Sequence, residues 1–211
     1  MSDSTEASVA DTTPAPPRTP VWRHIANGAA LAGILFASAV ALHTAPTEGQ
    51  WQAPITVTGE LGQTVAGRNI QATVTSVRVA EKVTASNGWS GSTSGVWVVV
   101  DASVEAVITD FGVSLGTAQL EIGGTHYSAS ERPEAGSISD EVLSVGLAKT
   151  GPLMFEVPRD ALTGIDGESA EIHLAVNSDP RADSMIVVPV DLSAIPVESS
   201  IETEKPVWGD E

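Results

Sequence analysis

An uninterrupted apolar run from Ile25 to Leu42 constrains this chain more than any other feature of its sequence. The run reads IANGAALAGILFASAVAL and holds 18 residues without a charge. At about 1.5 Å per residue, a helix of this length just spans a bilayer core of about 30 Å. The run and its flanks, residues 21–45, therefore predict a transmembrane helix.

The basic residues around this run indicate its orientation. Arg18 and Arg23 precede it, and the next basic residue is Arg68. The positive-inside rule then places the N-terminus in the cytoplasm. We therefore expect a single-pass protein of the cell membrane, in which residues 1–20 form a disordered cytoplasmic tail and the C-terminal part is extracellular.

A cleavable signal peptide is the main alternative, because the small residues from Ala39 to Ala41 suit a signal peptidase. The leader, however, is long and carries Asp3, Glu6 and Asp11, unlike a usual signal-peptide n-region. We therefore favour an uncleaved signal anchor. A secreted protein after cleavage is the second interpretation, and a buried helix of a soluble protein is the third.

Charge and cysteine content limit the functions of the part that follows the run. It holds 24 of the 27 acidic and 8 of the 10 basic residues, a net charge of −16. Such a surface repels nucleic-acid backbones and anionic lipids, and it favours basic proteins or divalent cations as partners. The chain has no cysteine. Disulfides, thiol catalysis and cysteine metal sites are therefore excluded.

Residues 46–54 are expected to form a linker, with Trp51 either at the membrane interface or in a first strand. After this linker the apolar residues recur with a period of two residues. Gly, Pro and Asx residues separate short alternating runs, which predict a β-rich domain over 55–192. The predicted strands cover 69–80, 95–106, 119–122, 126–129, 152–157, 170–176 and 184–192. This pattern indicates an all-β, immunoglobulin-like β-sandwich. Residues 193–211 lack periodicity and are expected to form a disordered acidic tail.

Several local features refine the expected sandwich. In the run from Gly95 to Ala106, alternate residues from Val96 onward face the core, which leaves Trp97 and Val99 on the outer face. A change of phase near Thr75 and Ser76 predicts a β-bulge. Gly123-Gly124 predicts a primed hairpin turn. Pro189 lacks an amide hydrogen and assigns its strand to a sheet edge.

The segments WVVVDASVEA, LEIGGTHYSAS and GPLMFEVPRDAL, in this order, resemble the telokin-like domain of unknown function found in Gram-positive and actinobacterial membrane proteins and lipoproteins. The resemblance covers about Ile55 to Asn177. The chain departs from the family at two points. Ala106 stands where these domains usually carry Asn, and an apolar anchor replaces the lipobox cysteine of the lipoproteins. The resemblance implies an extracytoplasmic, immunoglobulin-like fold and no catalytic residues.

A flexible Gly- and Ser-rich loop at 85–94 carries Trp89, a large aromatic side chain on an otherwise polar segment. Loops on a rigid scaffold commonly carry binding residues. We therefore predict a partner-contact surface formed by Trp89, Trp97 and Val99. The alternative is that both tryptophans pack against the edge of the sandwich.

Other motifs predict no catalytic residue, no metal site and no cofactor. Gly112 to Gly116 matches G-x-S-x-G, and His126 and His173 are conceivable bases, but strands rather than a strand and a helix flank the motif. The histidines show no spacing typical of a metal site, and His173 is expected to be solvated on an outer face. The acidic loops at 166–168 and 177–183 match no EF-hand pattern and are expected to be ordinary turns.

These observations predict a membrane-anchored interaction or accessory module of the cell envelope that is not an enzyme and has an envelope protein as its partner. A ligand- or calcium-binding extracytoplasmic sensor is the alternative.

Overall fold

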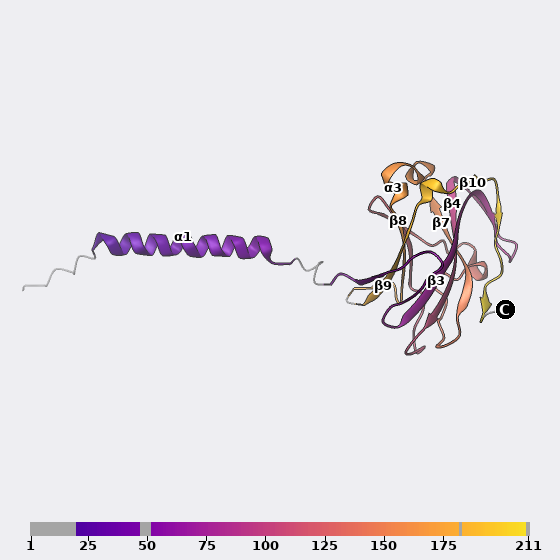
Figure 1. Cartoon of the computed structure of the whole chain (residues 1–211), viewed down its shortest axis with the longest axis horizontal. Coiled ribbons are helices and arrows are strands. Elements are labelled where there is room, and N and C mark those ends of the chain that lie inside the picture. The colour runs from indigo at the N-terminus through magenta and orange to yellow at the C-terminus, as the bar shows by residue number, and fades with distance from the viewer. Residues whose placement is uncertain (1–19, 47–51, 182, 210–211) are drawn as a thin grey trace, which may run out of the picture. The chain divides into compact units, whose positions relative to one another are not determined.

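A computed structural model describes residues 20–46, 52–181 and 183–209 of the chain. The chain divides into two compact units, one up to Thr47 and one from Glu48 onward. The described part of the first unit is a helix, and the second unit is built mainly of strands (Figure 1). The predictions for residues 1–19, and the two predicted places for Trp51, lie outside the described residues.

Helix α1 spans Val21–Thr44, with Pro20 before its first residue and Pro46 shortly after its last. Proline is tolerated at a helix start, whereas the residue before a proline is driven to extended backbone, which Ala45 adopts. The 24 residues of α1 extend over about 36 Å. None of them is buried. By length and composition α1 could cross a membrane, although a signal sequence has the same properties.

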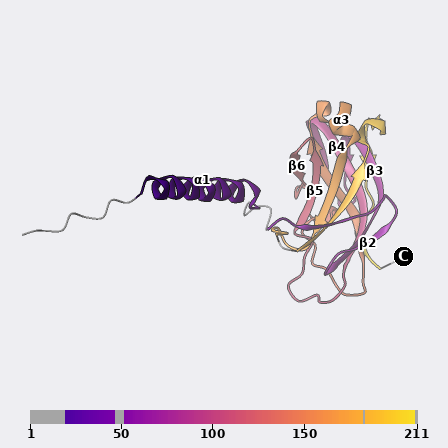
Figure 2. The same cartoon turned by 60° about the vertical axis from the view of Figure 1, so that its left-hand side comes forward.

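Two β-sheets form the second unit (Figures 1 and 2). The first has the order β1-β9-β8-β5-β6, with strands at Ile55–Thr58, Ser184–Val190, Ala170–Ala175, Thr117–Ile122 and Thr125–Ser128. The second has the order β10-β3-β4-β7-β12, with strands at Val197–Glu198, Ile70–Thr84, Ser90–Ala106, Lys149–Val157 and Val207–Trp208. Strands β2 (Thr64–Ala66) and β11 (Ile201–Glu202) also pair with β3. The predicted β-sandwich is thereby confirmed.

Short helical segments connect some of these strands. They are η1 (Glu134–Gly136), η2 (Arg159–Leu162), α3 (Gly164–Glu168) and η3 (Leu192–Ala194). Segments η2 and α3 follow one another between β7 and β8, and α3 lies at one end of the sandwich (Figure 1). The opposite end carries the loop from β4 to β5 and the loop from β8 to β9.

The main core lies between the two sheets. Val98 and Val100 of β4 and Leu120 of β5 are fully buried there, together with Ile172 of β8. The strict alternation of β4 produces this arrangement, since every second residue points to the same face. Burial of such side chains is the dominant favourable contribution to folding, about 25 cal/mol per Å² of apolar surface.

The β3–β4 hairpin confirms the predicted bulge and corrects the predicted loop. Its register shifts between Val74 and Ser76, where the sequence changes phase. Pairing continues through Thr84 and Ser90, so that the turn covers only 85–89 rather than 85–94. The Gly- and Ser-rich residues 90–94 therefore belong to β4. Residues 90–92 extend the strand because β3 offers them a paired backbone, which composition alone does not indicate.

Strand β9 corrects another expectation. It lies between β1 and β8 and is not an edge strand. Pro189 is tolerated because β1 ends at Thr58, which lies opposite Val187, two residues before the proline. On its other side Pro189 is the partner of Glu171 in β8. The turn at Gly123-Gly124 has positive φ angles of 57° and 77°, as a primed hairpin requires.

The described C-terminal residues are not a disordered tail. Strands β10 and β11 pair in parallel with β3, and β12 pairs antiparallel with β7. The segment 197–208, which we name the C-terminal strap, thus runs from one edge of the second sheet to the other. Backbone hydrogen bonds and a few separated apolar side chains, Ile201 above all, hold it in place. Strands of two residues show no periodicity, so the sequence pattern does not indicate them.

Candidate functional site

The predicted contact surface of Trp89, Trp97 and Val99 is wrong in two of its three residues. Trp97 and Val99 have no exposed surface at all. They form a second apolar cluster with Met154 of β7 and Ile201 of the C-terminal strap. The strap covers the outer face of β4, which explains why residues assigned correctly to that face are inaccessible.

Trp89 packs against this second cluster and is half-buried. The loop that contains Arg132 and Pro133 also covers the cluster. It is joined to the turn before Trp89 by a hydrogen bond, in which the side-chain amide of Asn87 donates to the carbonyl oxygen of Pro133 over 2.7 Å. The guanidinium carbon of Arg132 lies 5.4 Å from the Trp89 ring centroid and 5.8 Å from that of Trp97. Cations within about 6 Å of an indole face are attracted to it. Both tryptophans therefore belong mainly to the packing of the domain.

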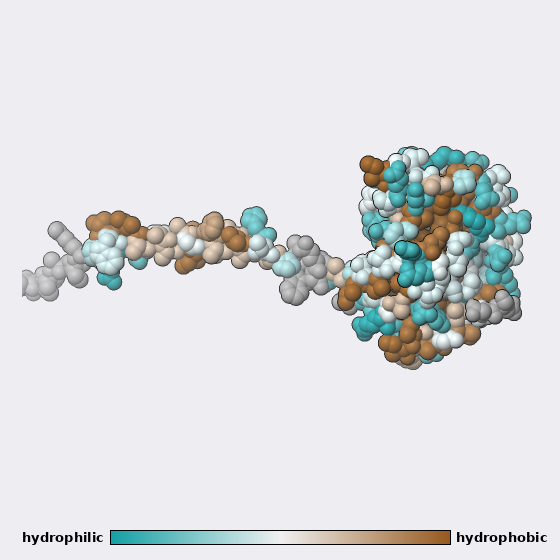
Figure 3. Space-filling model, in the orientation of Figure 1, coloured by the Kyte–Doolittle hydropathy of each residue, from teal (hydrophilic) through white to brown (hydrophobic). Residues whose placement is uncertain are grey.

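A different set of apolar side chains is exposed at the end of the sandwich opposite α3. We name it the end patch. It consists of Val107, Ile108, Phe111, Val142, Val145 and Leu147. Phe111 is 92% exposed and Ile108 is 70% exposed. Hydrophobic surface gathers at this end of the sandwich in Figure 3. Contiguous apolar surface of this kind is typical of interaction sites.

Two loops bring the end patch together. Backbone bridges join Ala106 to Val145 and Ser114 to Val142, and the amide of Leu143 donates to the carbonyl oxygen of Val113 over 3.0 Å. These contacts fix the loop after β4 against the loop before β7. Asp110 and Asp140 are exposed on the same two loops. The loops that form the end patch thus also carry exposed negative charge.

The outer face of the first sheet carries a second candidate site, which we name the His–Glu cluster: Glu121 of β5, His126 of β6, and Glu171 and His173 of β8. Glu121 is the cross-strand partner of both His126 and Glu171. The rings of His126 and His173 have centroids 5.8 Å apart. Three strands therefore bring two imidazoles and two carboxylates to one place.

Sequence reasoning missed this cluster, although it placed His173 on the correct, outer face of its strand. His173 is 4% exposed and not solvated as expected. The histidines are far apart in the chain, and ligand spacing along one helix or strand is the signal that sequence patterns carry. Here the pairing register of β5 with both neighbours creates the proximity. The cluster could have been predicted only from the correct pairing register of these strands.

Distances within the His–Glu cluster define what it can do chemically. The Nε2 atom of His173 lies 3.0 Å from Oε2 of Glu171 and 3.5 Å from Oε2 of Glu121. Nε2 of His126 lies 4.0 Å from the same Glu121 oxygen. One ligand atom each from Glu121, His126 and His173 falls within 4.8 Å of the others. The cluster can hold ion pairs or a metal ion, so the expectation of no metal-binding residues is not supported.

Two of the remaining motifs, 112–116 and 177–183, lie in loops, whereas the acidic segment 166–168 belongs to the short helix α3 and is not the expected turn. Gly112 to Gly116 leads into strand β5 rather than a helix, so no nucleophile elbow forms. In the acidic loop after β8, the Arg181 side chain binds the Asp179 carboxylate and lowers its pKa from the ordinary value. Asp183 lies 3.7 Å from Arg68 and accepts from the Ser184 amide. Asp179 thus serves a local turn, whereas Asp183 also connects this loop to Arg68, just before β3.

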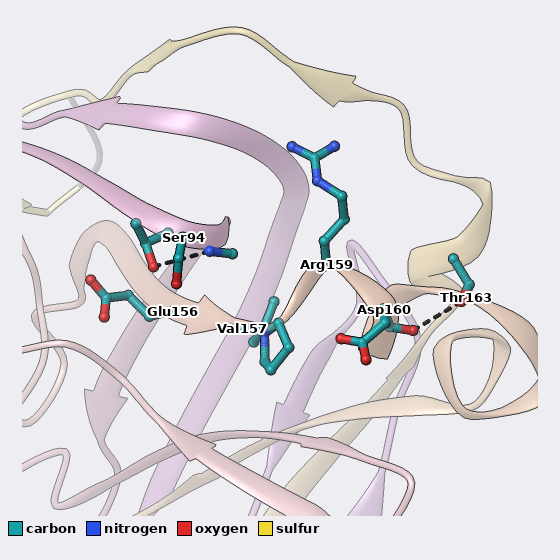
Figure 4. Close-up of a pocket in the computed structure, with 9 residues that line it drawn as sticks. Ser94, Glu156, Val157, Arg159, Asp160 and Thr163 are labelled. Atoms are coloured by element: carbon teal, nitrogen blue, oxygen red, sulfur yellow. Dashed lines mark hydrogen bonds between the residues drawn. The ribbon is translucent and has the colours of Figure 1, made fainter.

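A pocket of about 680 Å³ lies between the beginning of β4 and the turn after β7. Figure 4 shows the side chains of Glu156, Arg159 and Asp160 around it, spread apart rather than converging on one point. Glu156 pairs with Arg132, and Arg159 pairs with Glu81. The charged groups of Glu156 and Arg159 are thus engaged by partners outside the pocket lining.

Comparison with known proteins assigns the chain to no family. No family model matches the chain. No curated protein matches it. A crystal structure of an uncharacterized β-sandwich protein from Clostridium difficile 630 aligns with 64% of this chain and 96% of its own, at 13% identity and a TM-score of 0.42.

Proposed function

We propose that the chain is a membrane-anchored, extracytoplasmic β-sandwich of the immunoglobulin-like, telokin-like class that serves as an interaction module of the cell envelope. The apolar, unburied helix α1 supports an uncleaved anchor. The basic residues Arg18 and Arg23, which precede its apolar run from Ile25, support an N-terminus inside. The sandwich is then the extracellular part. That the chain is not an enzyme stays a prediction.

The end patch is the observation that carries the interaction role. Its loops expose Phe111 and Ile108 while the surrounding strands are well packed. Aromatic side chains at the centre of an interface contribute most of its binding energy, and a polar rim surrounds them. Asp110 and Asp140 supply a negative rim. We therefore propose a protein partner with an apolar recess bordered by basic residues.

A photo-crosslinking amino acid in place of Phe111 tests this proposal in cells that make the full chain. Ile165 of α3, which is 80% exposed at the opposite end, is the matched control position. We expect one envelope protein to be crosslinked from position 111 and not from position 165, and Ile108→Ser to weaken that product at least tenfold. Identical products at both positions, or none at 111, would contradict the proposal.

A second candidate function is an ion-binding extracytoplasmic sensor. The His–Glu cluster specifically favours it, since its imidazole and carboxylate groups are potential ligands. Calcium, the ion named in the alternative sensor function, is a poorer match to this cluster than an ion that accepts nitrogen ligands. The sensor role would use the sheet face, whereas the interaction role uses the end patch.

A further inference from the structure

We propose that the His–Glu cluster is a binding site for a divalent transition-metal ion of the Zn²⁺ class, with Glu121, His126 and His173 as ligands. This inference rests on the second candidate function, the ion-binding sensor, and names its ion and ligands; it is independent of the interaction role. The two sites lie on different parts of the sandwich, so a metal ion can bind whether or not a protein partner does.

The separations of the ligand atoms match a shared ion better than direct hydrogen bonds. Zn²⁺ binds imidazole nitrogen and carboxylate oxygen at about 2.0–2.1 Å, so that tetrahedral ligand atoms lie about 3.3 Å apart. Glu121 Oε2 is 3.5 Å from His173 Nε2 and 4.0 Å from His126 Nε2. Both distances exceed a hydrogen bond of about 2.9 Å. The side chain of His126 is 51% exposed, and a small rotation of it shortens the distance between His126 Nε2 and Glu121 Oε2.

The proton balance of the cluster also favours a cation. His173 Nε2 faces oxygens of both Glu171 and Glu121. A ring nitrogen carries at most one hydrogen, and the 3.0 Å contact makes Glu171 its hydrogen-bond partner, while Glu121 at 3.5 Å is beyond an ordinary hydrogen bond. A divalent ion on the lone pair of Nε2 attracts both carboxylates at once. The buried ring of His173, held on a central strand, keeps this arrangement in place.

The ligand types select the class of ion. Two imidazoles with a carboxylate suit Zn²⁺, Cu²⁺ or Ni²⁺, whereas Ca²⁺ and Mg²⁺ prefer oxygen ligands alone. Glu171 Oε2, 3.0 Å from His173 Nε2, is close enough to serve as a fourth ligand or to orient a bound water. The pairing of three strands places the three ligand atoms within 4.8 Å of one another before a metal binds.

Zinc titration of the full chain tests the assignment. The chain, purified in detergent without a histidine tag and stripped with a chelator, is titrated with ZnCl₂ by calorimetry, and bound zinc is counted by elemental analysis. His126→Ala is the main variant, because its exposed side chain contributes little to folding. Glu121→Gln is the second variant. His43→Ala, at the end of α1, is the matched control that removes a histidine elsewhere.

We expect one Zn²⁺ per chain for the unmodified protein and for His43→Ala, and at least a tenfold weaker affinity for His126→Ala and Glu121→Gln. Co²⁺ should give the visible absorption of a nitrogen- and oxygen-ligated site that changes in His126→Ala. Absence of stoichiometric binding would overturn the proposal and identify the cluster as a set of ion pairs only. Equal affinity in all four proteins would overturn it too, because zinc would then bind elsewhere.

Discussion

The indole rings of Trp89 and Trp97 meet edge to face, with centroids 5.6 Å apart and ring planes at 84°. This is one of the arrangements that aromatic quadrupoles favour. Arg132 lies over both rings and pairs with Glu156 of β7. The outer face of β4 is therefore a second core, closed by the loop that carries Arg132 and by the C-terminal strap.

Truncation of Trp97 should reveal how much this second core contributes. Trp97→Ala removes a fully buried ring, and we expect a loss of about 3–5 kcal/mol in the free energy of unfolding. Trp97→Phe should cost less than half as much. The indole Nε1 of Trp97 is buried without a hydrogen-bond partner among the described residues, so replacing Trp97 with phenylalanine removes an unpaired donor. Urea unfolding of the full chain in detergent measures both, and equal losses would contradict this account.

The C-terminal strap should stabilise the domain mainly through Ile201. This residue is 2% exposed and packs in the second core. Ile201→Ala should lower the free energy of unfolding by about 2–5 kcal/mol. Val197→Ala, in β10 of the same strap but 39% exposed, is the control and should change it by no more than about 0.5 kcal/mol. If the two variants unfold at the same urea concentration, the strap does not close a core.

Asp191 should give the domain an acid-sensitive contribution to stability. The side-chain hydrogen bond from Ser193 is the largest cause that lowers the pKa of Asp191 from its ordinary value of 3.8, and the amides of Ala194 and Ser193 add to it. A carboxyl with a lowered pKa stabilises the folded state above its unfolded-state pKa, and this contribution is lost as the pH falls through the folded-state pKa. Asp191→Asn should therefore lower the urea midpoint at pH 7 and have a smaller effect at pH 3. An equal effect at both pH values would contradict the assignment.

The sequence predicted most of the sandwich because its strands are long and strongly periodic. Alternation in β4 identified the core-facing residues from Val96 onward, and the phase change at Thr75 located the bulge. Alternation assigns a residue to a face but does not tell what covers that face. Trp97 and Val99 were thus placed correctly and interpreted wrongly, since the strap that buries them has no period of its own.

The candidate sites were less predictable, for two different physical reasons. The His–Glu cluster depends on the register of β5 with β6 and β8, which the spacing of His126 and His173 along the chain does not contain. The end patch depends on how two loops are fixed to each other. Phe111 and Val142 are ordinary apolar loop residues in the sequence, and only the backbone bridges between these loops bring them together.

The form of the mature protein tests the central claim, a sandwich held outside the cell by an uncleaved anchor, most directly. Intact cells are treated with protease, and the full chain from untreated membranes is analysed by mass spectrometry. We predict that the chain retains the residues before Ile25 and resists extraction by alkaline carbonate. Protease should remove the sandwich and leave α1 in the membrane. A soluble protein in the medium that begins at Leu42 would contradict the claim, because α1 would then be a cleaved signal sequence.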